Sequence, residues 1–505
     1  MTTVFVSNWL ELKEAVTNPL DEELEIVLEQ DVLFEEALPL VIKEGCQFII
    51  KTDSTSCRPF SLEIQSHLSH RHFTVKGALC LDRVVLDGGG LFIDGGYVNL
   101  AAGSTVQNGH HHDGGACYIQ GEGRLDMMTG AKITHNTAEN TGGAVYVHQG
   151  IFVAEGGCLQ HNHAQSGGAI YNNGTVSLKN EVLLQCNEAR RGGGIYNLLT
   201  LNLTNQASLL ENRAVEGGGI FNLGRCQLKD GAKIAQNKAT TGGGIYHGDG
   251  RVLMIGQPIL SENVATDKGG GFYMTAFEAE LGQVWHRSLW IGGAVFQGNR
   301  AKKGGALYLK DSEAPISIEL EGVEFLENRA EYGGALYLAL KSSGNQAIGM
   351  DPSLLFQHNH GSGVYECLRP DATPIPKSLY PVLDNHHIWV SREGELPIMG
   401  ALERIGESFP DDVLATYMAQ LLYLDVEDIC WQSNLDKLYE LDISLLAVQD
   451  LTGLQRLRRL VNLKIREEQL PLLEGFEDIP NLIVADLGVR EKPVRQSWFK
   501  RWFRK

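Results

Sequence analysis

The chain has 505 residues, of which 43% are hydrophobic and 21% are charged, so it has enough apolar surface for a large core and is not intrinsically disordered. It holds 58 Gly but only 15 Pro, which excludes a collagen-like chain. The 62 acidic residues outnumber the 43 basic ones and give a net charge of −19, which disfavours nucleic acid as a partner of the main body.

The cysteines and the N-terminal segment both indicate the cellular compartment of the protein. Nine cysteines are scattered along the chain without a Cys-x-x-Cys motif, which indicates neither a disulfide framework nor a zinc ribbon. Reduced thiols in a cytosol-like compartment are the simplest interpretation. The opening MTTVFVSNWLELKEAV lacks the basic start and apolar stretch of a secretory signal. We therefore expect a cytoplasmic protein, and a non-classical export route stays open.

Short apolar runs predict strands in residues 1–104, and a repeat of about 25 residues then occupies residues 105–366. The early strands are expected near residues 24–29, 38–51, 60–64, 72–86 and 91–99. Each repeat has a pair of glycines, an aromatic residue four positions after the first of them, and an Asn five or six positions before it. The glycine pairs begin at Gly114, Gly142, Gly167, Gly192, Gly217, Gly242, Gly269, Gly304 and Gly333.

The repeat predicts stacked parallel strands rather than helices. Each copy has a short run of β-branched and aromatic residues, bounded by a glycine pair that would destabilise a helix interior. No apolar stripe at helical spacing appears between residues 100 and 365. A period near 25 with two or three short strands fits a parallel β-helix, in which each coil lies about 4.8 Å from the next.

Stacking of the coils brings equivalent residues into columns. The asparagines are expected to form a ladder of side-chain amides at a turn; its central members are Asn136, Asn162, Asn187, Asn212 and Asn237. We expect the aliphatic residue before each aromatic to point into the core, which places the aromatic on the outer face. The reverse assignment is open, because the preceding small residue would make room for an inward ring. The aromatic column includes Tyr146, Tyr171, Tyr196, Phe221 and Tyr246.

The Gly-Gly-Ala-[Ile/Leu/Val] and Phe-x-x-Asn phrases resemble those of the chlamydial polymorphic outer-membrane proteins and, more widely, of right-handed parallel β-helix repeat proteins of the pectin-lyase-like class. Three copies match the second phrase literally, at Phe296, Phe325 and Phe356. The resemblance covers about residues 105–365 and makes residues 1–104 look like a cap and opening coils. It implies a right-handed single-stranded coil and a surface or adhesin-like role of a bacterial protein.

A different pattern follows the β-helix repeats. The Pro-containing residues 367–395 predict a linker. Residues 396–489 begin with an expected helical stretch at 396–420, followed by the phrase Leu-x-x-Leu-x-Ile at Leu438 and Leu460 and a variant of it at Leu482, 22 residues apart. This pattern resembles a short leucine-rich-repeat module of the bacterial, internalin-like kind; an ordinary helix pair is the alternative. The fold class expected is therefore mainly β, a β-helix followed by a small α/β domain.

Residues 490–505 form a basic aromatic tail with seven basic residues and one acidic residue. Its aromatic side chains recur at helical spacing, with basic residues opposite; they are Trp498, Phe499, Trp502 and Phe503. This composition is typical of a peripheral anchor on anionic lipid. Docking of the aromatic side chains on the leucine-rich module is the alternative.

One weak metal candidate comes from the coil columns. His135, His161 and Cys186 share the position just before the ladder Asn in three consecutive coils. Soft ligands about 5 Å apart could hold Zn²⁺ or Cu²⁺. Because Glu and Gln fill the same column in later coils, the sequence favours a solvated polar column, and no cofactor is predicted.

A second candidate site is an insertion in the repeat. The spacing of ladder asparagines rises to 36 residues between Asn263 and Asn299, where the chain reads TAFEAELGQVWHRSLWIGG. Its candidate binding residues are Trp285, His286, Arg287 and Trp290. Such side chains can stack on and hydrogen-bond a sugar or a peptide. The alternative is a hydrophobic patch that covers one face of the rod or contacts a partner.

The sequence favours a non-catalytic recognition or scaffold protein that binds a protein or glycan. Acidic residues of the coils occupy different repeat positions, so they do not stack into the calcium site or carboxylate pair of a pectin-lyase-like enzyme. The alternative function is that of a polysaccharide lyase or hydrolase of that class.

Overall fold

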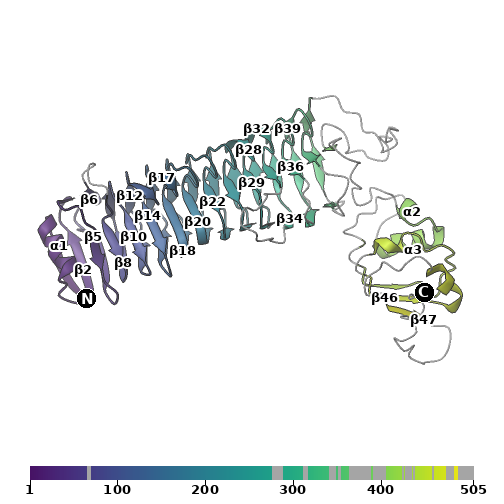
Figure 1. The fold of residues 1–505 in the computed structure, drawn as a ribbon, viewed down its shortest axis with the longest axis horizontal. Helices are drawn as coiled ribbons and strands as arrows, with labels where there is room; N and C mark the ends of the chain where they lie inside the picture. The colour runs from purple at the N-terminus through teal and green to yellow at the C-terminus, as the bar shows by residue number, and fades with distance from the viewer. Residues whose placement is uncertain are drawn as a thin grey trace.

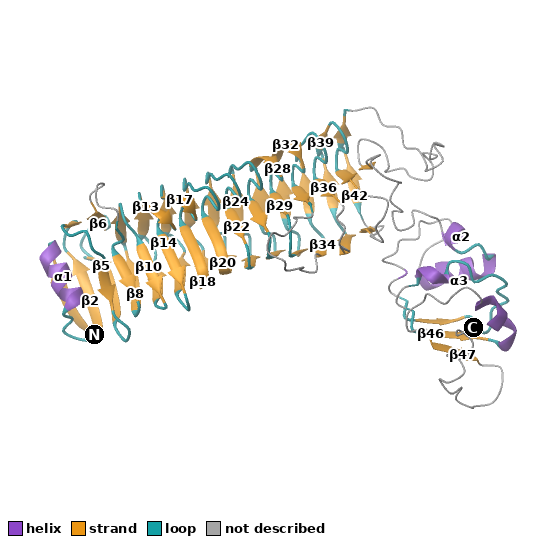
Figure 2. Cartoon of the chain, viewed as in Figure 1, coloured by secondary structure: helices purple, strands orange, loops and turns teal. Residues whose placement is uncertain are grey.

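The computed structural model is mainly β and forms a parallel β-solenoid of about 14 turns. Strands stacked side by side form the rod in Figures 1 and 2. The prediction of a parallel β-helix is therefore confirmed. The structure describes residues 1–64, 70–275, 288–310, 317–339, 348–350, 354–362, 388–390, 405–422, 426, 435, 438–457, 460–473 and 483–486, and every structural statement below concerns these residues.

Each coil begins with a strand that carries the aliphatic and aromatic residues of the repeat phrase. These strands pair in parallel from coil to coil within one large sheet. They are β4 (Leu40–Ile42), β7 (Phe73–Val75), β10 (Leu91–Asp94), β14 (Cys117–Gln120), β18 (Val145–Glu155), β20 (Ile170–Lys179), β22 (Ile195–Asn197), β25 (Ile220–Asn222), β29 (Ile245–His247), β33 (Phe272–Met274), β36 (Leu307–Lys310), β40 (Leu336–Ala339) and β44 (Ile388–Val390). Strand β44 lies within the predicted linker and pairs with β40.

A second strand of each coil continues the same sheet. In the coils of β18 and β20 it is fused with the first strand into one long element. The separate second strands are β1 (Thr2–Val6), β2 (Glu23–Leu28), β5 (Gln47–Thr52), β8 (Ala78–Asp82), β11 (Tyr97–Leu100), β15 (Arg124–Met128), β23 (Thr200–Leu203), β26 (Arg225–Lys229), β30 (Arg251–Ile255), β34 (Ser288–Gly292), β37 (Ser317–Glu321) and β41 (Ile348–Met350).

A third strand from each coil builds a separate 13-stranded sheet. Its members are β3 (Val32–Phe34), β6 (Phe60–Ile64), β9 (Val84–Asp87), β12 (Thr105–Gln107), β16 (Lys132–Thr134), β19 (Cys158–Gln160), β21 (Leu183–Gln185), β24 (Ser208–Leu210), β27 (Lys233–Ala235), β31 (Ile259–Ser261), β35 (Val295–Gln297), β38 (Glu324–Leu326) and β42 (Leu355–Gln357).

After the third strand the chain turns and forms a short extended segment before the next glycine pair. Parallel bridges join these segments along one edge of the rod (Figure 1). Three pairs are long enough to count as strands: β13 (His110–Asp113) with β17 (Thr137–Thr141), β28 (Lys238–Thr241) with β32 (Val264–Lys268), and β39 (Arg329–Ala330) with β43 (His360–Gly361).

The first glycine of each pair makes the corner that leads into the next coil. Gly217 has φ +66°, and a Cβ placed there would lie 2.3 Å from the carbonyl oxygen of Ile220. A side chain would clash with backbone that the coil cannot move. The glycine phrase is therefore required by the sharpness of the corner.

The aliphatic column fills the interior of the rod. Ile170, Ile195, Ile220 and Ile245 are fully buried in one core that runs from Val6 to Leu338. The aromatic residues next to them form a separate cluster on the opposite side of the strands, as expected from the alternation of strand side chains. From Tyr196 to Tyr337 these rings are nevertheless at most 9% exposed, because they stack on one another and are covered by neighbouring side chains.

Helix α1 (Trp9–Thr17) covers the N-terminal end of this core. The side chain of Asn8 caps it by accepting a hydrogen bond of 3.1 Å from the Glu11 N–H. The buried face of the helix packs against β1, β3 and β4, and the Trp9 ring lies 4.5 Å from that of Phe34. The helix therefore shields the apolar interior at the N-terminal end of the described rod.

The C-terminal residues have a hydrophobic core of their own, from Ile405 to Ile465. It is built by α2 (Ile405–Ser408), α3 (Asp412–Leu422), β45 (Glu440–Asp442), η1 (Leu454–Arg456), β46 (Asn462–Ile465) and η2 (Glu467–Leu473), and β47 (Ile483–Asp486) pairs with β46. The three strands are parallel. Leu463 pairs with Leu441 and with Val484, so the third strand lies one residue away from the alignment that the leucine phrase predicts with Ala485. Assignment as a leucine-rich-repeat module stays a prediction.

Candidate partner-binding groove

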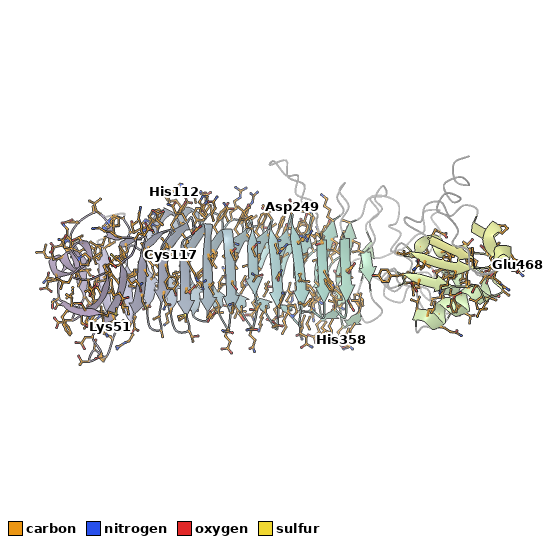
Figure 3. The ribbon with its side chains drawn as sticks, turned by 90° about the horizontal axis from the view of Figure 1, so that it is seen from below. Lys51, His112, Cys117, Asp249, His358 and Glu468 are labelled. Atoms are coloured by element: carbon orange, nitrogen blue, oxygen red, sulfur yellow. The ribbon has the colours of Figure 1, made fainter. Side chains whose placement is uncertain are left out.

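The turn after the third strand has the same backbone conformation in ten successive coils. The residue just before the ladder position has positive φ, for example 55° at Cys186, 56° at Glu211 and 54° at Glu262. The column runs from Asn108 to His358, which Figure 3 labels towards the far end of the rod. Only Gly298 in this column is a glycine. We call these positions the turn column.

The ladder asparagines hold the turn from the inside. Each side-chain amide donates to the side-chain oxygen of the next, over 3.0 Å from Asn187 to Asn212 and 3.0 Å from Asn212 to Asn237. The backbone N–H of each donates to the same oxygen, and the amide also donates to a carbonyl of the third strand one coil earlier. The ladder is continuous from Asn136 to Asn359, so its buried polar groups are paired.

Asn108, which the repeat places first in this series, is not part of the ladder. It is exposed and occupies the turn column, where its amide donates to Asp87 over 2.8 Å. The ladder position of that coil is Gly109, whose N–H donates to the Asn136 side chain. The glycine pair begins five positions after Gly109 but six positions after Asn136 in the next coil, and the register of the paired segments shifts between His111 and Asp113.

The residue after each ladder position begins the extended segment and points outward. We call these positions the strand column; its members include Glu188, Arg213, Lys238, Val264, Arg300 and Arg329. The turn column and the strand column form the two walls of an open groove with a volume of about 820 Å³. It extends over six coils, from His161 to Gly298 of the turn column.

The two walls differ in charge. On the turn column, the carboxylate of Glu211 accepts a hydrogen bond from Gln185 over 3.0 Å, and that of Glu262 accepts one from Gln236 over 2.9 Å. On the strand column, Arg213, Lys238 and Arg300 are exposed, and no side-chain hydrogen bond or ion pair is found for them within the part of the chain that the structure describes. The groove therefore presents Glu211 and Glu262 along one side, and the unpaired cations Arg213, Lys238 and Arg300 together with a single carboxylate, Glu188, along the other.

Beyond the strand column, basic side chains cover the aromatic column. The Lys268 ammonium lies 5.9 Å from the centre of the Tyr308 ring, and that of Lys303 lies 5.4 Å from Tyr337. The Arg191 guanidinium lies 5.6 Å from the Phe221 ring and pairs with Glu216 over 2.8 Å. Rings and an acid hold these cations, in contrast to Arg213, Lys238 and Arg300 of the strand column.

The three metal-candidate residues share the turn column but do not converge. The rings of His135 and His161 stack with centres 5.0 Å apart and an interplanar angle of 18°. The Cys186 thiol donates to Glu211 over 3.4 Å, and burial together with this acceptor raises its pKa. Among the described residues no group of three or more His, Cys, Asp or Glu side chains is arranged to hold a metal ion.

The candidate insert is only partly described. Trp290 lies on strand β34, where it pairs with Leu253 and Glu319 and is 46% exposed. It therefore belongs to a regular coil rather than to an inserted loop, because the strand that contains it begins at Ser288. Trp285, His286 and Arg287 lie outside the described residues, as do the tail residues Trp498, Phe499, Trp502 and Phe503.

Two features of the coils were not predicted, although the sequence carries a signal for each. The residue after the aromatic is a buried Asn in three coils, and Asn172, Asn197 and Asn222 form a second ladder with bonds of 2.7 and 2.6 Å. Its signal is the Asn that ends the phrases GGAIYN, GGGIYN and GGGIFN. The strand column is the other feature, and its signal is the basic residue directly after the ladder Asn in four of the later coils.

The fold and surface are those of a β-helix repeat protein, and a comparison with known families agrees. Residues 293–310 match the Chlamydia polymorphic membrane protein repeat. The chain is thus a β-helix protein with a repeat like that of the polymorphic membrane proteins, which fits an adhesin-like repeat protein. No curated protein and no solved structure matches the chain. Within the described residues, no helix is both long and apolar enough to span a membrane.

Proposed function

We propose that this protein is a non-catalytic recognition rod that binds a macromolecular partner, a protein or a glycan, along its side. The observation that carries the proposal is the groove between the turn and strand columns. It continues over six coils and holds the unpaired cations Arg213, Lys238 and Arg300. Solvent-exposed charges without partners contribute little to the stability of a fold, so their arrangement in a column favours a role in recognition.

The repeat structure supports an elongated contact. Each coil adds one residue to each wall, and the walls are fixed from inside by the asparagine ladder. A partner that lies along the rod therefore meets a preorganised surface and loses little free energy to ordering it. Adhesin-like repeat proteins use extended surfaces of this kind, and the family match is consistent with that role.

The experiment is a binding screen on protein and glycan arrays with three forms of the full chain. The first is wild type, the second is Arg213→Glu/Arg300→Glu in the groove, and the third is the control Arg225→Glu/Arg251→Glu. Arg225 and Arg251 are exposed on the neighbouring strands β26 and β30, away from the groove. We expect ligands that bind wild type and the control but lose at least tenfold in affinity for the groove variant.

Two results would contradict this proposal. One is a set of ligands that the groove variant and the control bind equally well. The other is turnover, seen as new reducing ends or unsaturated products when the protein is mixed with polyuronides and neutral glycans, which would favour a lyase or hydrolase.

A further inference from the structure

We propose that the groove binds an extended polypeptide segment in which acidic and basic residues alternate. This inference rests on the proposed recognition function and names the chemical class of its partner. It follows from three features of the groove: the opposite charge of its walls, the free polar atoms on each wall, and its length.

The opposite charge of the walls selects against a ligand of a single sign. A polyanion that lies along Arg213, Lys238 and Arg300 is repelled by Glu211 and Glu262 on the opposite wall. A polycation that lies along the two carboxylates is repelled by the three cations. Like charges held close together cost several kcal/mol across an interface, so neither chain satisfies both walls. A ligand with negative groups along one edge and positive groups along the other does so.

Both walls have free atoms aimed at such a ligand. The two hydrogen bonds to Glu211, from Gln185 and Cys186, both end on Oε2, which leaves Oε1 for a cationic group. Gln236 likewise binds Oε2 of Glu262. On the other wall the guanidinium groups of Arg213 and Arg300 can each bind a carboxylate through two N–H groups.

The length and width of the groove fit an extended chain. Six stacked coils span about 24 Å at a spacing of about 4.8 Å, which is the length of about seven residues in a β-strand. Successive side chains of a strand point to opposite sides. A strand that lies along the groove therefore directs every second side chain to the acidic wall and the others to the basic wall. Alternating charge is the sequence pattern that matches both.

The test uses synthetic eight-residue peptides and isothermal titration calorimetry at low salt. The first peptide is (Glu-Lys)₄, and its control is Glu₄Lys₄, which has the same composition and net charge but segregated signs. Glu₈ and Lys₈ complete the set. We expect (Glu-Lys)₄ to bind at least tenfold more tightly than each of the other three peptides, with an affinity that falls as salt is raised.

Variants of the full chain assign the binding to the groove. Arg213→Gln/Arg300→Gln is expected to weaken (Glu-Lys)₄ binding at least tenfold, and the control Arg225→Gln/Arg251→Gln is expected to leave it unchanged. A variant that exchanges the charges of the walls combines Glu211→Arg/Glu262→Arg with Arg213→Glu/Lys238→Glu/Arg300→Glu. It should restore binding, because an alternating peptide regains the charge match by sliding one residue. All these side chains are exposed, so circular dichroism should show the same fold.

Three outcomes would overturn the inference. They are equal binding of (Glu-Lys)₄ and Glu₄Lys₄, tighter binding of Glu₈ or Lys₈, and no binding of any peptide by a folded protein. If the array screen nevertheless finds ligands that depend on Arg213 and Arg300, the recognition function stands and only the class of its partner is wrong.

Discussion

At the scale of single residues, the groove depends on a backbone conformation that side chains usually avoid. The turn column has positive φ in ten coils, and nine of its members are not glycine. The left-handed conformation costs roughly 1–2 kcal/mol for such a residue. The ladder asparagine that follows compensates for this cost, because its side chain makes up to four hydrogen bonds in the interior. From His135 onward, each turn residue with this strained backbone conformation is therefore followed by an asparagine of the ladder.

A second feature at this scale gives the protein a predicted pH dependence. His72 is fully buried, where its Nε2 lies 2.7 Å from the Leu62 carbonyl and its Nδ1 accepts a 2.9 Å hydrogen bond from the Gly90 N–H. Burial lowers the pKa of His72 from 6.5 to about 3. The unfolded chain therefore takes up a proton near pH 6.5 that the folded protein refuses until about pH 3.

We expect the free energy of unfolding to fall by about 1.4 kcal/mol per pH unit for this group as the pH drops from 6 to 4. Urea unfolding of wild type and His72→Gln at pH 7, 6, 5 and 4 measures the slope. In His72→Gln the unfolded chain no longer binds this extra proton, so the free energy of unfolding should fall less steeply with pH than in wild type. The exposed control His135→Gln should keep the wild-type slope. Identical slopes for wild type and His72→Gln would show that His72 is not the group concerned.

At the scale of elements, the columns rather than the individual strands are the cooperative units. Most strands have only three to five residues, and a strand of that length has little stability alone. Each is stabilised by a column that continues above and below it, such as the asparagine ladder, the aliphatic core and the stacked rings of Tyr196, Phe221 and Tyr246. A defect in one column should therefore affect the coils on both sides.

Asn212→Ala tests the ladder. The side chain of Asn212 donates to Leu184 and Asn237 and accepts from the backbone and side chain of Asn187. Loss of buried partners should lower the free energy of unfolding by about 2–5 kcal/mol in urea. The control is Asn140→Ala, whose exposed amide makes one hydrogen bond, to Asp113. Its effect should stay within about 0.5 kcal/mol. Equal losses in the two variants would contradict a structural role of the ladder.

At the scale of the whole molecule, the described residues contain the hydrophobic core of the rod, with the aromatic cluster on the other side of its strands, and a separate C-terminal core. The core of the rod runs from Val6 to Leu338, and the C-terminal core extends from Ile405 to Ile465. No residue belongs to both cores. Because each core buries its own apolar side chains, we expect the stability of the rod not to depend on the C-terminal core.

A fragment of residues 1–395, which retains β44, should fold on its own. We expect its circular dichroism to show the β-structure of the rod and its unfolding midpoint to match that of the corresponding transition in the full chain. Differential scanning calorimetry of both proteins measures this. A fragment that is unfolded, or that melts many degrees lower, would show that the rod needs the residues that follow it.

The β-helix and its columns follow from the repeat period alone. A period of 25 or 26 residues places equivalent side chains above one another whatever the details of the coil, so the column of Ile195 and the ladder of Asn187, Asn212 and Asn237 could be predicted from spacing. Whether Ile195 or the aromatic residue beside it faces the interior was left open by the sequence and was decided by the structure. Spacing alone did not identify the ladder position of the coil before Asn136, because Asn108 lies six positions before its glycine pair, as Asn136 does, whereas the ladder position is Gly109, five positions before it.

Which surface residues act together depends instead on the path of the backbone in three dimensions. Glu211 and Arg213 are two positions apart in the chain, but their placement on opposite walls depends on the left-handed turn between the third strand and the segment that follows. The near-complete burial of Tyr246 and the position of Trp290 on a strand were likewise fixed by packing. The repeat period determines the position of a residue along the axis of the rod. The side of the rod to which its side chain points depends on the bend of the backbone at each corner, and that bend results from hydrogen bonds between coils.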